Sequence, residues 1–529
     1  MFFIVGMAVT LVLYVAIGFL ISRKVKNADD YFVAGRNAPT MLITGSLVAS
    51  FIGVGLFMGD VGESYSGFFA PIIVAVGVLS VGYILGSIFF GRYLRRSEAN
   101  TIPEFFGKRF DSGALKMLAS ITGSFIMIVY SLSCVQGIGT LMSMVTGLHY
   151  NVCIIIAVAV FTLITISSGA KGVLITDTIM YALFSVAAII GAIFVAVKAG
   201  GWTSTVSEMA TYEEISGILS GSGNLDYFYS TGVENMVWAV GYGIAWMAVL
   251  MVAPWQSSRY LMAKSEHTVI RSGIIASASV FVIEFLMCMA GVFIQKINPG
   301  MESASHALIW ASMEVMPKIL GVVVLSGVLA SAISSATTFL SLVSSNITKD
   351  IAKIKDERKQ VVYGKWIAII VAAVLLFLCI LNPPQIFWIT YLGATIVACS
   401  WLPVSIASVW SKRVTKVGAF ASMLSGFVVS TVMKLITVAN DILLPIYFDP
   451  FFVGIAVSII ALIVGSLLTK VTDKEKEERE KLFIAPEENN DPKTVRTTKI
   501  FVLATIGLGL IITIVMLALW VIPYLNGLQ

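Results

Sequence analysis

Long apolar runs, separated by short polar stretches, extend over almost the whole chain. A helix that crosses a bilayer needs about 20 mostly apolar residues. By this criterion the pattern predicts about fourteen spanning helices, near residues 2–22, 41–60, 70–92, 116–146, 151–169, 173–198, 237–256, 270–294, 319–344, 364–381, 385–410, 417–437, 447–469 and 499–524. The predicted fold class is therefore an all-α integral membrane protein.

The basic residues support this number of helices and predict their orientation. Cytoplasmic loops of membrane proteins carry the excess of Lys and Arg. With the N-terminus outside, the inner loops and adjacent helix ends hold 31 of the 35 basic residues. The outer side keeps Lys198, Lys296, Lys318 and Lys434. The charge pattern therefore predicts a multi-pass protein of the cell (cytoplasmic) membrane with its N-terminus and C-terminus both outside.

Composition excludes a soluble protein. Of the 529 residues, 58% are hydrophobic and 12% are charged, so the lipid bilayer is expected to be the main partner. The polar run 470–498 is interpreted as a solvated cytoplasmic linker, and residues 1–529 as a single polytopic transporter domain. The chain has no HExxH, GxSxG or Walker-type motif, so we expect no enzyme activity and no binding to nucleic acid. A monomer or a weak homo-oligomer is expected.

Two predicted segments contain glycines that could interrupt a helix. The second has three glycines between Ser50 and Gly59, and the seventh has Gly241 and Gly243, with Pro254 further along. Transporters place such breaks in corresponding positions of two inverted repeats, because free backbone groups are tolerated only at a polar cavity. The pair predicts five-helix repeats at about 41–198 and 237–410. Alternatively, the glycines only allow helices to pack closely.

The ninth segment carries a row of hydroxyl side chains. Ser331, Ser334, Ser335 and Thr338 follow i, i+3, i+4, i+7 spacing and share one helix face, with Thr337 beside them. Sodium is a hard cation that prefers oxygen ligands. The row is either an ion site or ordinary packing, with hydroxyls bonded back to their own helix.

In this order, several motifs resemble the sodium:solute symporter family over roughly residues 1–470. They lie at 30–36, 49–59, 172–177, 329–335 and 410–413. The resemblance implies a leucine-transporter-like fold, with one helix before the ten-helix core and three after it. It also implies sodium-coupled symport of a small organic solute by alternating access. A proton-coupled or uniport carrier of the same fold, or a transporter-like sensor, is the alternative.

The resemblance also implies where sodium ions bind. One sodium is expected between the first broken helix and the ninth segment, held by the carbonyls of Ala49, Ile52 and Ser331 and the hydroxyls of Ser334 and Ser335. A second sodium is expected in some members of the family, and matching positions here are Asp177, Thr337 and Thr338. The alternative for Asp177 is an interfacial residue near the inner end of its helix.

The expected solute pocket departs from the sugar and proline members of that family. Their polar contacts beside the first break correspond to apolar residues here. The expected pocket residues are Phe51, Gly55, Leu56, Trp246, Leu250, Trp388 and Thr390, joined by Glu284. Such a pocket suits a small, partly apolar or planar solute better than a sugar.

Glu284 lies in the middle of the eighth segment, where an ionisable group is costly and a functional role is the default hypothesis. It either attracts a cationic solute, couples protons, or is protonated and takes no part. Asp60 and Glu63, near the outer end of the broken helix, are expected to form the outer vestibule.

Overall fold

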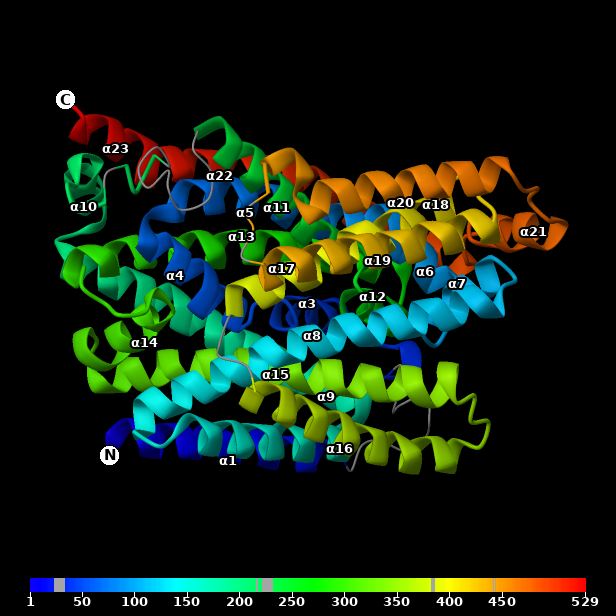
Figure 1. Ribbon diagram of the computed structural model, residues 1–529, viewed down its shortest axis with the longest axis horizontal. Helices are drawn as coiled ribbons and strands as arrows, with labels where there is room; N and C mark the ends of the chain where they lie inside the picture. The colour runs from blue at the N-terminus through cyan, green and yellow to red at the C-terminus, as the bar shows by residue number, and fades with distance from the viewer. Residues whose placement is uncertain (23–33, 216, 221–231, 382–385, 441, 443) are drawn as a thin grey trace.

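A computed structural model describes residues 1–22, 34–215, 217–220, 232–381, 386–440, 442 and 444–529, which form an elongated bundle of helices (Figure 1). No strand occurs in this part of the chain, apart from one isolated bridge between Ala38 and Ala263. Within the same residues, 11 helices are long and apolar enough to cross a membrane. Three shorter apolar helices are Phe2–Tyr14, Thr40–Ala49 and Tyr150–Ile166. The all-α membrane fold is confirmed, and the number fourteen stays a prediction, as do the two repeats.

The helices follow one another with few long connections. In chain order they are α1 (Phe2–Ser22), α3 (Thr40–Ala49), α4 (Val61–Glu63), α5 (Phe69–Gly86), α6 (Arg92–Arg96), α7 (Ile102–Arg109), α8 (Gly113–Thr146), α9 (Tyr150–Ala199), α10 (Trp202–Glu208), α11 (Gly232–Val252), α12 (Pro254–Met262), α13 (Glu266–Ile297), α14 (Ala307–Trp310), α15 (Lys318–Ser345), α16 (Glu357–Leu381), α17 (Ile386–Ile396), α18 (Leu402–Trp410), α19 (Lys416–Ala439), α20 (Pro450–Leu467), α21 (Asp473–Lys481), α22 (Pro492–Met516) and α23 (Ile522–Gly527).

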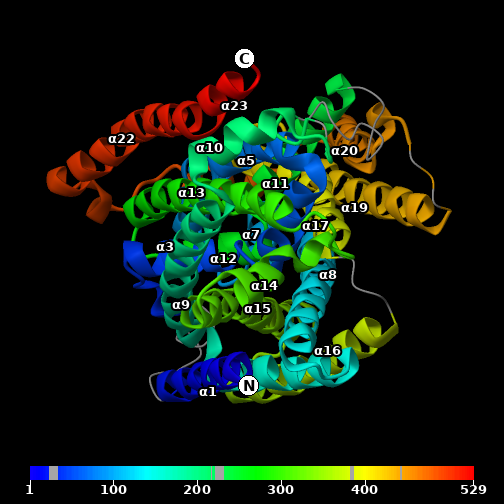
Figure 2. The same ribbon diagram turned by 90° about the vertical axis from the view of Figure 1, so that its left-hand side faces the viewer.

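Burial divides the bundle into a centre and a periphery. In α13 and α15, 78% of the most apolar stretch is buried, whereas none (0%) of that stretch is buried in α22. The end-on view in Figure 2 places α1, α16, α19, α20 and α22 around the outside. Their exposed side chains are mostly apolar, as in Leu503, Ile506 and Leu510 of α22. Such helices are stable when lipid, rather than water, surrounds them.

The predicted break in the second segment is confirmed. Helix α3 ends at Ala49, residues 50–53 are not helical, and the helix resumes at Val54. Backbone carbonyls beside the break find side-chain donors, because the Tyr83 hydroxyl donates to the Leu47 carbonyl at 2.7 Å. The Ser50 hydroxyl donates to the same carbonyl at 3.0 Å. The break is therefore stable inside the protein, where no lipid meets its polar groups.

The break predicted at Gly241 and Gly243 is wrong. Helix α11 continues through both glycines to Val252, and the interruption lies at Ala253 (φ −55°, ψ 143°), directly before Pro254. Proline has no backbone N–H and disfavours helical geometry in the residue before it. A Cβ at Gly243 would come within 2.9 Å of the Ala75 carbonyl oxygen, so this glycine allows α11 to lie close against α5.

Two predicted connections also differ from the structure. The loop expected at 170–172 falls within helix α9, because a short stretch without proline can keep a helical backbone. The stretch 470–498 is not a simple solvated linker, since it contains α21, which begins with a capping box between Thr472 and Glu475. Glu475 is only 1% exposed, and its carbonyl accepts a hydrogen bond from Arg109 Nη1 at 2.9 Å. This docking holds α21 against α7.

Both chain ends lie at the same end of the bundle, and α21 lies at the opposite end (Figure 1). This arrangement agrees with an even number of spans. Residues 304–315, which connect α13 and α15, form a short stretch of 3-10, α and π helix. Residues 30–33 of the first family motif lie outside the described part of the chain.

Candidate functional site

The break after α3 faces the hydroxyl row of α15. Ser334 Oγ lies 3.3 Å from the carbonyl oxygen of Ala49, the last residue before the break. A Cβ at Gly53 would lie 3.4 Å from Ser335 Oγ, so Ser335 also approaches the break. Ala49, Ile52, Ser331 and Ser334 are fully buried, and Ser335 is 3% exposed. The structure thus places the five expected sodium ligands in two buried segments that meet at the break.

The chemistry of this meeting point suits a small hard cation. Carbonyl and hydroxyl oxygens are neutral ligands of the kind that sodium prefers. The Ser331 hydroxyl donates to the Val328 carbonyl of its own helix at 2.8 Å, so its expected contribution is only its carbonyl. Ser335 is different, because its hydroxyl forms no hydrogen bond among the described residues. Ser335 also lines a cavity, which is described below. Its oxygen is therefore available to an ion.

Asp177 lies next to this point and is fully buried. Its Oδ1 accepts a hydrogen bond from the Ser334 hydroxyl at 2.6 Å, and its Oδ2 accepts one from the Ser46 hydroxyl at 2.5 Å. Arg259 Nη2 lies 3.1 Å from the same Oδ2 and forms an ion pair with it. Both oxygens of the carboxylate therefore have partners, and one of these is a full positive charge.

Arg259 also binds Thr338, one of the two threonines expected at a second sodium site. Its Nη2 donates to Thr338 Oγ1 at 2.8 Å, while the Thr337 hydroxyl donates to the Ser334 carbonyl of its own helix at 3.0 Å. The sequence analysis missed Arg259, because it counted this residue as part of an inner loop. Its position five residues after Pro254, where a broken helix enters the bundle, is the signal that could have identified it.

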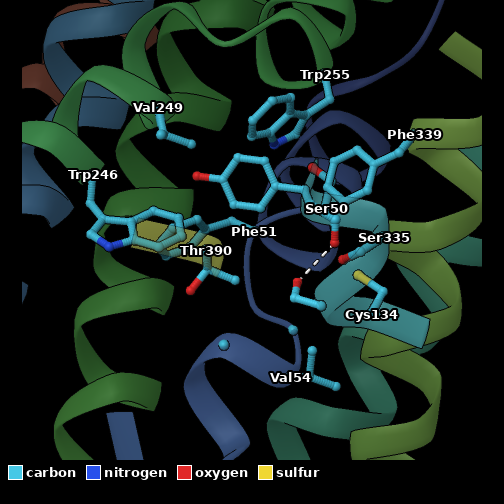
Figure 3. Close-up of a pocket in the computed structure, with 14 residues that line it drawn as sticks. Ser50, Phe51, Val54, Cys134, Trp246, Val249, Trp255, Ser335, Phe339 and Thr390 are labelled. Carbon is cyan, nitrogen blue, oxygen red and sulfur yellow. Dashed lines mark hydrogen bonds between the residues drawn. The ribbon is translucent and has the colours of Figure 1, made fainter. Parts of the chain in front are cut away.

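Beside Ser335 lies a cavity, named the central cavity here (Figure 3). Its lining residues are Ser50, Phe51, Gly53, Val54, Gly55, Tyr130, Ser133, Cys134, Trp246, Val249, Trp255, Ser335, Phe339 and Thr390. Four of the expected solute residues are among them: Phe51, Gly55, Trp246 and Thr390. Because Ser335 belongs to the lining too, the expected sodium site and this cavity share a wall.

Aromatic rings make up most of the cavity wall. The Tyr130 ring lies 4.8 Å from Trp255 and 5.8 Å from both Trp246 and Phe339, measured between centroids. The Phe51 ring lies 5.5 Å from that of Trp246. Tyr130 Oη and Trp246 Nε1 are buried and have no hydrogen-bond partner among the described residues. Buried polar atoms normally have partners, so both are suited to contact a bound solute.

Helix α8 contributes residues that the sequence analysis missed, namely Tyr130, Ser133 and Cys134. Their signal was present, because two serines follow Tyr130 in the middle of an otherwise apolar segment. Two expected solute residues lie elsewhere. Leu250 packs against α5, where a Cβ at Gly82 would come within 3.0 Å of its own Cβ, and Val249 lines the cavity instead. Trp388 carries Lys434 Nζ 4.9 Å from the centroid of its ring and lines neither described cavity.

A second cavity, named the acidic cavity, adjoins the first. Its lining residues are Phe51, Gly55, Leu56, Asp60, Leu79, Tyr242, Trp246, Glu284 and Thr390. Leu56 and Glu284 of the expected solute residues therefore lie here. Asp60, which was expected in the outer vestibule, faces the same cavity and is half-buried.

Comparisons with known proteins agree with this geometry. The model of the sodium:solute symporter family matches residues 31–426. The sodium/proline symporter of Salmonella typhimurium is 25% identical over 81% of this chain and 88% of its own length. The sodium/pantothenate symporter of Escherichia coli is 22% identical over 83% of this chain and 90% of its own length.

Solved structures show the fold. The substrate-bound, outward-open structure of a Na⁺-coupled sialic acid symporter superposes with a TM-score of 0.69 at 18% identity, covering 90% of this chain and 99% of that one. A transporter of the nucleobase-cation-symport-1 family, in a closed conformation, superposes with a TM-score of 0.53 and 11% identity over 85% of this chain and 98% of that one.

Proposed function

The chain belongs to the sodium:solute symporter family, and on this premise we propose that the α3 break and α15 hold the sodium ion that couples its transport. It is a sodium-coupled symporter of the membrane and not an enzyme. The proposed ligands are the carbonyls of Ala49, Ile52 and Ser331 and the hydroxyls of Ser334 and Ser335. The observation that carries the proposal is the 3.3 Å contact of Ser334 Oγ with the carbonyl oxygen of Ala49, the last residue before the break.

The shared wall at Ser335 explains how ion and solute depend on each other. Sodium from outside binds first and holds the broken helix against α15. This fixes Phe51, which lies within the break, against Trp246 at the solute pocket. The bundle then rocks and opens inward, where low sodium empties both sites. One charge moving inward through 100 mV contributes about 2.3 kcal/mol to solute accumulation.

The proposed solute site is the central cavity together with the acidic cavity. Trp246, Phe51 and Thr390 line both cavities, with Gly55 beside the break and Leu56 and Glu284 on the acidic side. Trp388 and Leu250 would join only after rearrangement. Polar atoms among aromatic rings favour a small, partly apolar or planar organic solute. The relatives named above carry proline and pantothenate, which are also small organic molecules.

The number of sodium ions depends on whether a second one binds at Asp177, Thr337 and Thr338. In this conformation the Arg259 guanidinium provides positive charge to Asp177 and donates to Thr338. We therefore propose that one sodium couples transport while Arg259 is in place. Two sodium ions would require the guanidinium to leave first. A Hill coefficient of about 1 for sodium supports the first case, and a value near 2 supports the second.

We also propose the setting of the chain. The concentration of 31 of 35 basic residues on one side favours the cell membrane with both termini outside. The core repeats are proposed at about 41–198 and 237–410, and the chain is proposed to act as a monomer or weak homo-oligomer. Coupling to protons, or uniport, is the alternative.

A thermal-shift assay on the purified protein tests the coupling. The panel contains amino acids, carboxylates, amines, vitamins and sugars, each in sodium and in potassium at equal ionic strength. We expect a solute that raises the melting temperature only in sodium, because coupled ligands increase each other's affinity. A solute that stabilises equally in both salts would contradict sodium coupling.

A further inference from the structure

Glu284 is a buried acid with a carboxyl oxygen that lacks a hydrogen-bond partner among the described residues. It is 2% exposed, and its Oε2 has no hydrogen-bond partner among the described residues. Neither Glu284 nor Asp60 forms an ion pair in this part of the chain. A buried carboxylate without a counter-charge is costly, so such groups are normally paired. Something other than the described side chains is therefore expected to complete this site.

Glu284 lines a cavity as well. Glu284 and Asp60 both line the acidic cavity, and the Tyr242 hydroxyl donates to Asp60 Oδ1 at 3.1 Å. Phe51 and Trp246 line this cavity and the central one. A ligand in the solute pocket can thus reach both carboxyl groups. Asp60, which is half-buried, lies on the more open side.

Aromatic rings complete the wall around the two acids. Tyr242 and Trp246 lie 6.2 Å apart, and Trp246 and Phe51 lie 5.5 Å apart, between ring centroids. The face of an aromatic ring attracts a cation through its quadrupole, and tryptophan does so most strongly. Carboxylates and ring faces in one small cavity together suit an organic cation. A neutral solute could only hydrogen-bond to the two acids, without the attraction between opposite charges, and an anionic solute would be repelled by them.

A proton held between the acids explains the geometry less well. Two carboxyl groups that share a proton are joined by a short hydrogen bond. Here Glu284 Oε2 has no partner, and Asp60 Oδ1 accepts its hydrogen bond from Tyr242. A shared proton would also not need the aromatic rings that surround the cavity.

We propose that the solute of this symporter is a small organic ammonium ion, whose charged group binds between Glu284 and Asp60 and against Trp246, Tyr242 and Phe51. The apolar part of the solute extends into the central cavity. This inference rests on the proposed function, since it assigns the chemical class of the solute. Each transport cycle then carries the charge of the solute inward together with that of sodium.

Matched probes test the charge requirement on the full chain. Choline and 3,3-dimethylbutan-1-ol have nearly the same shape but differ in charge, and butylammonium and 1-butanol form a second pair. Thermal shift and solid-supported-membrane currents are measured with each probe in sodium. We expect stabilisation and a sodium-dependent current with an ammonium probe and neither with its neutral partner. No response to any ammonium probe, or equal responses within a pair, would overturn the proposal.

Substitutions locate the charged group. Glu284→Gln and Asp60→Asn are each expected to raise the half-saturating concentration of the ammonium probe by about 30-fold or more, as for a buried charge pair that loses one partner. Glu314→Gln, which removes an exposed carboxylate from the helical stretch 304–315, is the control and should leave that concentration unchanged. Unchanged affinity in both Glu284→Gln and Asp60→Asn would overturn the site. Should one variant fail to fold, the other variant and the matched probes still decide.

The outcomes separate this inference from the proposed function. Ammonium binding that is equal in sodium and potassium would refute the coupling and leave the ammonium site standing. Sodium-dependent binding confined to neutral or anionic solutes would refute the ammonium site and leave the coupling standing.

Discussion

The bundle contains two buried acidic groups that the protein treats in opposite ways. Asp177 has the Arg259 guanidinium 3.1 Å away, and both its oxygens accept hydrogen bonds from serine hydroxyls. Glu284 is equally buried, has an oxygen without a partner, and faces a cavity. Leaving a charge unpaired costs far more than pairing it. The contrast indicates that Asp177 belongs to the internal framework of the ion site, whereas Glu284 is kept available for a ligand.

The largest effect on stability is expected when the ion pair between Asp177 and Arg259 is broken. Arg259→Gln leaves the Asp177 carboxylate buried without its counter-charge, which should cost about 3–5 kcal/mol in the free energy of unfolding. The measurement is the thermal midpoint in detergent. The double variant Asp177→Asn with Arg259→Gln should recover part of the loss, and Arg413→Gln, at an exposed arginine between α18 and α19, should change little. A midpoint of Arg259→Gln equal to that of the wild type would show that the pair is not structural.

An intermediate effect is expected at Ser335, which lies between the two acidic regions and lines the central cavity. Ser335→Ala removes one proposed sodium ligand and should raise the half-saturating sodium concentration by about 10-fold, equivalent to about 1.4 kcal/mol. Sodium-dependent uptake or thermal shift measures this change. Ser331→Ala is the matched control on the same helix, since its hydroxyl bonds to the Val328 carbonyl and only its carbonyl is a proposed ligand. Equal sodium affinity in the two variants would argue against the site.

The smallest loss of stability is expected at Glu284. Glu284→Gln removes a buried carboxyl group that has an oxygen without a partner, so it should not lower the free energy of unfolding by more than about 1 kcal/mol. Asp177→Asn, which strips Arg259 of its partner, should cost several times more. Parallel thermal unfolding of the two variants makes the comparison. A large loss in Glu284→Gln would mean that this acid has a structural partner after all.

The predictable parts of the site are those that depend on local spacing. The hydroxyl row from Ser331 to Thr338 was visible because residues three and four apart share a helix face. The α3 break was visible because three glycines interrupt an apolar run. Gly243 looked the same but lies within a continuous helix, because glycine serves both for breaks and for close packing. Pro254 was the reliable signal, since its missing N–H acts wherever it stands.

Arg259 and Asp177 illustrate what local spacing cannot reveal. They are separated by 82 positions, and nothing in either neighbourhood indicates that their side chains meet. The same is true of Asp60 and Glu284, which come from different helices and share one cavity. Leu250 and Val249 show how precise a prediction of lining residues must be. They are neighbours on α11, and the rotation of this helix decides that Val249 lines the central cavity and Leu250 does not.

The sequence was sufficient for the all-α membrane class and, through its resemblance to a known family, for sodium as the coupling ion. In lipid, every backbone polar group of a segment must form its hydrogen bond within the same helix. This requirement acts on each segment separately, so the hydropathy of the sequence reveals it. Which buried charges acquire a partner depended on the folded packing. Electrostatic pairing requires contact within a few ångströms, and such contacts arise only when all the helices are in place.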